Sequence, residues 1–113
     1  KIASDFGARV KTIDWFSVNN FLPNAETLIN ATSLGMFGKP ELTIDLKPLS
    51  SKTLVVDLVY NPLKTHLLTQ AAKKGCPIVD GIGMLIHQAV PGFSRWFNVQ
   101  PTIDTALRNM LLS

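Results

Sequence analysis

The feature that most constrains the fold is a nearly continuous apolar run, Thr53 to Tyr60, that reads Thr-Leu-Val-Val-Asp-Leu-Val-Tyr. A strand with one face in water alternates apolar and polar residues, whereas a strand covered on both faces is apolar almost throughout. Strands of the second kind occur mainly in parallel sheets that carry helices on both sides. The run therefore predicts an α/β fold.

The segments around this run predict the remaining elements. Further strands are expected where β-branched residues cluster, over residues 8–13, 26–32 and 77–80. Helices are expected where apolar residues recur at helical spacing, over residues 1–6, 65–74, 84–97 and 101–112, with a helical turn over 17–22 that Pro23 stops. Residues 40–51 are expected to be irregular, and Pro91 is expected to kink or divide its helix. Crossover helices between strands imply a parallel sheet.

Composition and charge narrow the function classes. The chain is 46% hydrophobic and 17% charged, which is typical of globular proteins and excludes the disordered class. Its net charge of +3 comes from scattered Lys and Arg residues, and the densest pair is Lys73-Lys74. Nucleic-acid-binding proteins usually cluster such residues, so no nucleic-acid partner is expected. Binding of a nucleotide phosphate explains the excess of basic residues better than binding of a nucleic acid does.

The residues that most often bind metals or form disulfides give no such pattern here. Cys76 is the single cysteine, so an internal disulfide is excluded and a reducing compartment fits. His66 and His87 have no carboxylate or Cys at metal-ligand spacing, so we expect structural or surface roles and no metal site. No stretch approaches the ~20 apolar residues of a membrane span. We expect a cytoplasmic protein without a membrane partner.

Polar or glycine-containing loops follow three of the expected strands, at residues 30–36, 60–62 and 80–84. In open parallel sheets, ligands bind beyond the carboxyl ends of the strands, so these loops would form one ligand-binding rim. Hydroxyl and amide groups of the first loop can bind polar groups, and the glycines of the third let backbone approach a flat ring closely. Each loop alone also has an ordinary explanation, since Asn and Ser are common turn formers and a Tyr at a strand end usually packs.

Taken together, the three loops resemble the shikimate dehydrogenase family in order and in spacing. The motifs are Asn30-Ala31-Thr32-Ser33-x-Gly35-Met36, Asp57-x-x-Tyr60-Asn61-Pro62-x-x-Thr65 and Asp80-Gly81-x-Gly83-Met84-Leu85-x-x-Gln88-Ala89. The resemblance implies the C-terminal part of a Rossmann-like domain, with a mostly parallel sheet flanked by helices. It also implies an NADP-dependent oxidoreductase of aromatic amino acid and chorismate biosynthesis, which reversibly reduces 3-dehydroshikimate to shikimate.

The resemblance also implies roles for individual residues of this sequence. Cofactor contacts are expected from Asn30, Thr32 and Ser33, and contacts near the nicotinamide from Leu58, Gly81 and Met84. The Tyr60 hydroxyl and the Gln88 amide are expected to face shikimate. Neutral groups of this kind can both donate and accept hydrogen bonds, as a triol carboxylate requires. Asn98 stands where relatives commonly have Gly, and Asn tolerates the left-handed conformation.

Several parts of the family pattern do not occur in this sequence. They are the glycine-rich turn for the pyrophosphate, the Asn-Arg-Thr segment for the 2′-phosphate and the catalytic Lys and Asp pair. We therefore expect residues 1–113 to be the C-terminal portion of the NADP-binding domain, with the N-terminal substrate and catalytic domain absent and no catalytic residue in this chain.

Other interpretations stay open at this point. One is a quinate/shikimate dehydrogenase that uses NAD or NADP, and another is a non-catalytic binding module or fragment. A homodimer is one option for assembly. An exposed sheet edge, if the first strands are lacking, would favour association of the isolated chain.

Overall fold

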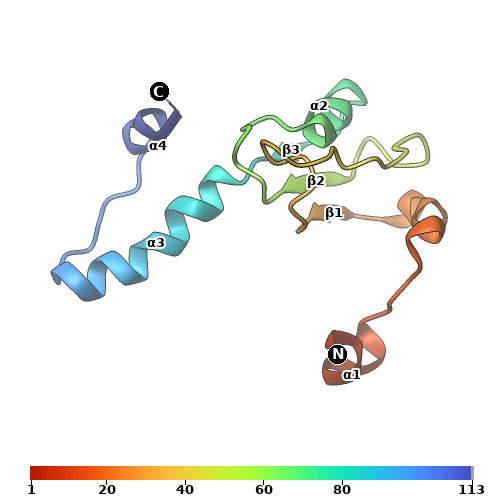
Figure 1. Ribbon diagram of the computed structural model, residues 1–113, viewed down its shortest axis with the longest axis horizontal. Coiled ribbons are helices and arrows are strands. Elements are labelled where there is room, and N and C mark those ends of the chain that lie inside the picture. The colour runs from red at the N-terminus through yellow and green to blue at the C-terminus, as the bar shows by residue number, and fades with distance from the viewer. Residues whose placement is uncertain (113) are drawn as a thin grey trace.

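The computed structural model describes residues 1–112, which form a small sheet with one helix packed beside it and further helices that stand away from it (Figure 1). Its helices are α1 (Ile2–Phe6), α2 (His66–Lys73), α3 (Ile82–Phe97) and α4 (Thr105–Leu112). Its strands are β1 (Thr27–Asn30), β2 (Leu54–Asp57) and β3 (Ile78–Val79). Three 3₁₀ turns precede the first strand: η1 (Gly7–Arg9), η2 (Trp15–Asn20) and η3 (Leu22–Asn24).

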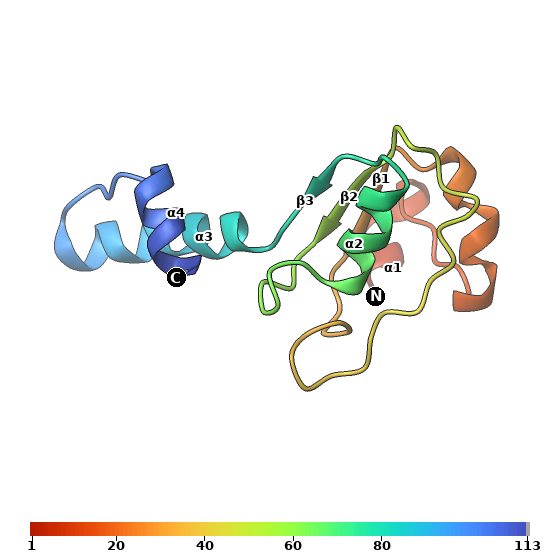
Figure 2. The same ribbon diagram turned by 90° about the horizontal axis from the view of Figure 1, so that it is seen from above.

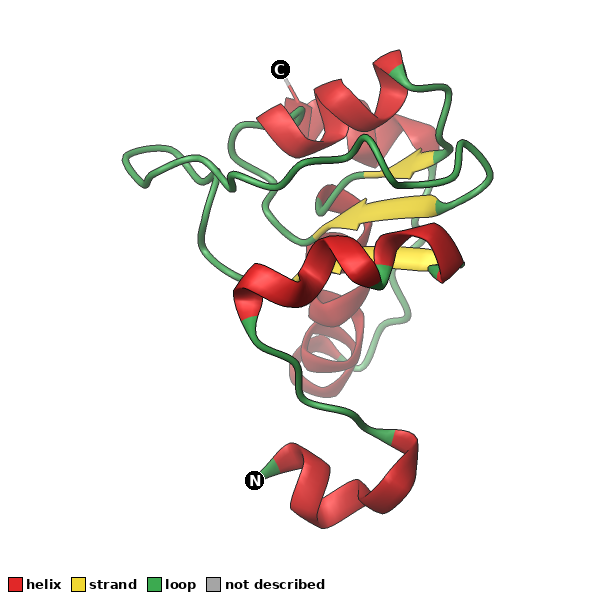
Figure 3. Ribbon diagram, turned by 90° about the vertical axis from the view of Figure 1, so that its right-hand side faces the viewer, coloured by secondary structure: helices red, strands yellow, loops and turns green. Residues whose placement is uncertain are grey.

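The three strands form one parallel sheet in the order β1-β2-β3 (Figure 3). Leu28 of β1 lies opposite Val55 of β2, and Val55 lies opposite Ile78 of β3. The β2–β3 connection contains α2, so this part is a strand–helix–strand unit. The predicted α/β fold with a parallel sheet is confirmed.

Helix α2 packs on one face of the sheet and forms much of the core. Thr65 caps its first turn, since the Thr65 hydroxyl accepts a hydrogen bond from the Leu68 amide at 3.3 Å. Gly75, with φ of 85°, ends the segment in the left-handed conformation that glycine adopts at little cost. The predicted helix over residues 65–74 is therefore confirmed. The core comprises Leu22, Leu42, Leu46, Leu49, Val55, Leu67, Leu68, Ala71 and Cys76.

Residues 40–51 are irregular, as predicted, yet they supply three of the core leucines. They cross the α2 side of the sheet and connect the end of β1 to the start of β2.

The sequence predicted that β2 is buried on both of its faces, and the structure shows this only in part. Val55 and Asp57 are buried, but Leu54 and Val56 on the opposite face are half-buried, and neighbouring Ile29 is 56% exposed. Of the described helices, α2 is the one that packs closely on β2 and β3.

The predicted strand over residues 8–13 is wrong. Residues 7–9 form η1, and residues 10–14 belong to no helix and pair with no strand within residues 1–112. Figure 1 shows this segment standing away from the sheet, so its backbone has no neighbouring strand to pair with. The helix predicted over residues 1–6 is confirmed as α1, and Gly7 follows it with φ of 68°.

The helical turn predicted over residues 17–22 forms slightly earlier, as η2. Pro23 does not stop a helix, because it lies at the start of the next turn, η3. That position suits proline, whose missing amide would have no partner within the first turn in any case.

Helices α3 and α4, with the segment that connects them, extend away from the sheet (Figures 1 and 2). We call residues 82–112 the helical arm. We call residues 22–80 the sheet lobe. The radius of gyration is 16.6 Å. A compact domain of this length would have a radius of about 13 Å, so the difference reflects the projecting parts.

Inside the arm, α3 runs through Pro91 without a break, so the helix is not divided there, and the alternative of a kink at Pro91 stays a prediction. Proline removes one backbone hydrogen bond, and the His87 carbonyl that loses its partner lies on an exposed residue, where solvent can satisfy it. Asn98 ends α3 with φ of 51° and ψ of 34°, which confirms the predicted left-handed residue. Helix α4 begins later than predicted, after Asp104 accepts a hydrogen bond from the Leu107 amide at 2.8 Å.

Candidate functional site

A cavity of about 280 Å³ lies beyond the carboxyl ends of β1 and β2. It brings together three of the predicted site residues, Thr32, Leu58 and Tyr60. The remaining lining residues are Ala31, Met36, Phe37, Val59 and Asn61. Two of the three predicted loops therefore form the walls of one cavity at the edge where parallel sheets bind ligands.

The first wall is the loop after β1, and Asn30 organises it. The Asn30 side chain is buried, and its amide nitrogen donates to the Leu34 carbonyl and to Asp57 Oδ1, both at 3.0 Å. Its amide oxygen accepts from the Thr32 amide at 3.0 Å and from the Thr32 hydroxyl at 2.7 Å. Because these atoms are all used within the protein, the side chain of Asn30 shapes the loop. Its predicted contact with the cofactor stays a prediction.

The second wall is the segment from Leu58 to Asn61. The Leu58 amide donates to the Asn30 carbonyl at 3.0 Å, and the Asn61 carbonyl accepts from the Phe37 amide at 2.9 Å. These two backbone bonds join the wall to the first loop on either side of the cavity. The Asn61–Pro62 peptide bond is cis. Tyr60 is 44% exposed, so part of its ring remains open to a ligand.

The third predicted loop reaches the same place through Gly81. A Cβ at Gly81 would overlap the Leu58 carbonyl group and would lie 2.8 Å from the carbonyl oxygen of Val59. No side chain fits against backbone this close, so glycine is required for the third loop to pack on the second. Whether Gly81 also approaches the nicotinamide, as predicted, stays a prediction.

Asp80 fastens the start of the helical arm to the sheet lobe. Its Oδ1 accepts from the Ile82 amide at 3.2 Å, and its Oδ2 accepts from Arg108 Nη2 at 2.6 Å. The second bond is an ion pair with both side chains partly exposed. It links α4 to the carboxyl end of β3.

The other predicted site residues lie outside the cavity. Ser33 is exposed in the first loop, and its carbonyl accepts from the Met36 amide at 3.3 Å. Met84 and Gln88 are exposed on α3, in the helical arm. A ligand that contacts both Tyr60 and Gln88 must therefore contact both the sheet lobe and the arm.

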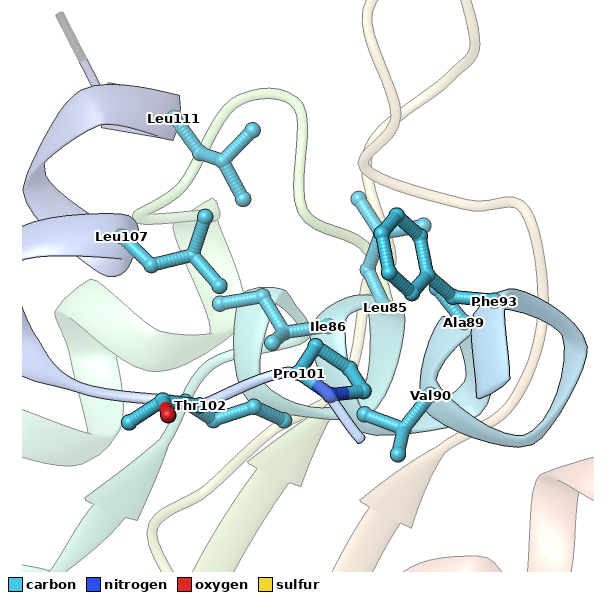
Figure 4. Close-up of a pocket in the computed structure, with 10 residues that line it drawn as sticks. Leu85, Ile86, Ala89, Val90, Phe93, Pro101, Thr102, Leu107 and Leu111 are labelled. Atoms are coloured by element: carbon cyan, nitrogen blue, oxygen red, sulfur yellow. The ribbon is translucent and has the colours of Figure 1, made fainter. Parts of the chain in front are cut away.

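A larger cavity, of about 480 Å³, lies between α3 and α4 (Figure 4). Leu107 and Leu111 of α4 point across it toward Leu85 and Ile86 of α3. Its walls are almost wholly apolar, with the Thr102 hydroxyl as the one polar side-chain group among the lining residues. Such walls cannot satisfy a highly hydroxylated ligand, so the cavity beyond the carboxyl ends of β1 and β2 is the better candidate site.

Sequence reasoning missed Phe37, which lines the cavity directly after the first motif. Its position after Gly35-Met36 was the available signal.

His66 lies on the surface, where its Nδ1 is 3.5 Å from Glu41 Oε2. Within residues 1–112, no three His, Cys, Asp or Glu side chains gather as a metal site would require. No helix in that range is long and apolar enough to cross a membrane.

Comparison with known proteins relates this chain to one group of dehydrogenases. No protein-family model matches the chain. The shikimate dehydrogenase (NADP(+)) of Cereibacter sphaeroides strain ATCC 17025 is 52% identical over 112 residues, which is 99% of this chain and 40% of that protein. The protein of that name from Paracoccus denitrificans is 50% identical over 113 residues and is matched over 40% of its length. The chain thus spans about 40% of the length of these curated relatives.

Solved structures give the same result. Quinate dehydrogenase from Corynebacterium glutamicum in complex with NAD is similar with a TM-score of 0.78 and 33% identity, over 88% of this chain and 35% of that one. Shikimate 5-dehydrogenase from Thermus thermophilus, in complex with NADP(H) and shikimate, is similar with a TM-score of 0.73 and 27% identity. That match covers 89% of this chain and 36% of the other.

Proposed function

We propose that this chain, which is homologous over its whole length to shikimate dehydrogenases and so belongs to that family, is the C-terminal portion of the NADP-binding domain of such an enzyme. The family resemblance drawn from the three motifs is thereby confirmed. The observation that carries the proposal is the cavity at the ends of β1 and β2, where residues from two of the motifs meet.

The parent enzyme, in this proposal, oxidises shikimate reversibly to 3-dehydroshikimate. A hydride leaves the carbon that bears the reacting hydroxyl, and the hydroxyl proton passes to a base. When bound, the nicotinamide ring of NADP supplies the hydride acceptor. The base is the family's Lys and Asp pair, which we expect in an N-terminal domain rather than within residues 1–113.

The described residues fit one end of a nicotinamide cofactor. The cavity has apolar walls at Leu58 and Met36, which suit a flat ring. The Thr32 hydroxyl already donates to Asn30 and accepts from the Leu34 amide, so it offers a polar carboxamide one further acceptor position. Gly81 brings the backbone of the third loop against Leu58 without side-chain bulk. Ser33 and Met84 would contact the cofactor from the loop and from α3. The role of these residues is to bind and orient, since none of them is placed to take a proton.

Substrate binding is assigned to Tyr60 and Gln88. Tyr60 is one of the residues that line the cavity, and Gln88 lies on the second turn of α3. A substrate held by both would be fixed in orientation relative to the ring.

The test is shikimate-dependent reduction of NADP, measured by absorbance of the reduced cofactor. It should be run on the 113-residue chain and on the full product of its reading frame. Activity in the full product, and none in the 113-residue chain, supports the proposal. Activity in neither contradicts the assignment of function, and turnover by the 113-residue chain contradicts the assignment of the base to another domain.

A second candidate is a quinate or quinate/shikimate dehydrogenase that uses NAD. The similarity to the NAD complex of a quinate dehydrogenase favours it. Comparing kcat/KM for shikimate and quinate, each with NAD and with NADP, separates the two candidates. We further propose that the enzyme is cytoplasmic and that it is a homodimer; light scattering on the full product would test the homodimer.

A further inference from the structure

We propose that Asp57 is a positioning residue, whose buried carboxylate sets the relative placement of the two cavity walls and through them the alignment of cofactor and substrate. The inference rests on the proposed function. Asp57 does not line the cavity and does not act on the reacting atoms itself.

The carboxylate is a junction between three segments. Asp57 is the last residue of β2 and is 0% exposed. Its Oδ1 accepts from Asn30 Nδ2 and from the Val59 amide, both at 3.0 Å. Its Oδ2 accepts from the Thr65 hydroxyl at 2.6 Å. One side chain therefore ties the first wall, the second wall and the start of α2 together.

Short paths lead from this junction to the site residues. On one side, Asp57 holds the side chain of Asn30, and the amide oxygen of Asn30 in turn holds Thr32 through the two hydrogen bonds that it accepts. On the other side, the Val59 amide belongs to the residue that precedes Tyr60. A shift of Asp57 would move Thr32 and Tyr60 relative to one another, and these residues stand on opposite walls of the cavity.

The hydrogen bonds demand a carboxylate. All three bonds to Asp57 are donated to it, and an amide in its place would present a donor to at least one of the same partners. Neither of the two ion pairs within residues 1–112 involves Asp57, so its charge is stabilised by hydrogen bonds rather than by a cation. No buried side-chain polar atom in that range lacks a partner. Losing one acceptor would therefore leave a buried donor unpaired, which is costly.

A purely structural role for Asp57 makes a different prediction. A residue that only stabilises the core lowers the melting temperature and leaves the kinetics of the folded enzyme unchanged. Val55 offers the matched control, since it is two residues earlier on the same strand, is equally buried and contacts neither cavity wall through a hydrogen bond. Val55→Ala should lower stability by removing core volume.

The experiment uses the full enzyme and the variants Asp57→Asn, Thr65→Val, Thr65→Ser and Val55→Ala, all measured well below their melting temperatures. We expect Asp57→Asn to lower kcat/KM by ~10- to 100-fold, as misplacement of about an ångström does in aligned reactions. It should also weaken NADPH binding, measured by fluorescence titration, and speed hydrogen exchange at the Val59 amide. Thr65→Val should shift the same three quantities by less, and Thr65→Ser should lose less than Thr65→Val because it keeps the hydroxyl.

Unchanged kinetics, NADPH affinity and exchange in Asp57→Asn would overturn the proposal, and so would an equal kinetic loss in Val55→Ala. If Asp57→Asn does not fold, the comparison of Thr65→Val with Thr65→Ser decides, through the same measurements of kinetics, NADPH affinity and amide exchange. An unmodified enzyme that does not reduce NADP with shikimate would refute the proposed function. NADPH binding and amide exchange would then still decide whether Asp57 positions the walls.

Discussion

The sheet lobe and the helical arm are stabilised in different ways. The core cluster lies wholly within the sheet lobe, where leucines from the irregular segment and from α2 pack against β2. In the arm, Ile82 and Ile86 are buried at the start of α3, but Phe93, Trp96, Phe97, Met110, Leu111 and Leu112 are exposed. Burial of apolar surface is the main stabilising term in folding, so the chain fixes the structure of the lobe more firmly than that of the arm.

The comparison shows how the candidate site depends on both regions. Thr32, Leu58 and Tyr60 belong to the lobe, while Met84 and Gln88 belong to the arm. Two features hold the regions together at the end of β3: the contact of Gly81 with Leu58 and the ion pair between Asp80 and Arg108. Mutations in each region and at the connection between them test this account.

The largest difference should appear between core positions of the lobe and exposed positions of the arm. Leu68→Ala removes a side chain that is 1% exposed and should lower the free energy of unfolding of the 113-residue chain by about 2–5 kcal/mol. Trp96→Ala removes one that is 79% exposed and should change it by less than ~0.5 kcal/mol. Urea unfolding followed by circular dichroism measures both, and similar losses would show that the contrast is wrong.

The connection at Gly81 should be the next most sensitive. Gly81→Ala places a methyl group against the backbone of Leu58 and should cost about 1–3 kcal/mol or more, because backbone cannot yield cheaply. Gly83→Ala is the matched control, since an added methyl group there would meet no atom within 4 Å and alanine favours a helix by up to ~1 kcal/mol. Thermal unfolding of both variants measures the difference. Equal melting temperatures would contradict the close contact.

A smaller effect is expected at the end of α3. Asn98 is in the left-handed conformation, where alanine is disfavoured, so Asn98→Ala should lower stability by about 1 kcal/mol. Asn98→Gly should keep or raise stability, because glycine adopts this conformation freely. If the two variants have the same stability, measured by urea unfolding, the helix does not end in this way in solution.

The smallest effect should come from the ion pair. Arg108→Gln removes the bond to Asp80 and should cost less than ~1 kcal/mol, because both partners are partly exposed. The loss should shrink as salt is added. Arg95→Gln is the control, since Arg95 forms no ion pair within residues 1–112. A loss for Arg108→Gln that does not change with salt would mean that packing, not charge, holds the arm.

The sequence predicted the sheet lobe well because its signals are local. The apolar run of β2 and the helical spacing of residues 65–74 each act within a few residues, and both elements formed as predicted, although β2 is covered on both faces only in part. The segment over residues 8–13 failed because a β-branched composition forms a strand only beside a pairing partner. The start of α4 was set by the side chain of Asp104, which sequence spacing alone did not reveal.

The candidate site was predicted in outline. The motifs identified the loops that meet at the carboxyl edge, and the structure brings Thr32, Leu58 and Tyr60 to one cavity. The internal use of the Asn30 side chain and the close contact of Gly81 could not be predicted, because both depend on distances between segments far apart in the sequence. The hydrogen bonds that Asp57 accepts agree with the high cost of an unpaired buried carboxylate.

The single thiol of the chain offers a way to watch the two regions separately. Cys76 is buried in the core cluster, and its Sγ lies 3.4 Å from the Ser50 carbonyl oxygen. A thiol reagent therefore reaches it only when the lobe opens, so the rate of modification reports opening of the lobe. A second cysteine introduced at an exposed arm position would react at once in the folded state. A fluorophore could thus be attached to the arm alone, and the slower modification of Cys76 would still measure the rate at which the lobe opens.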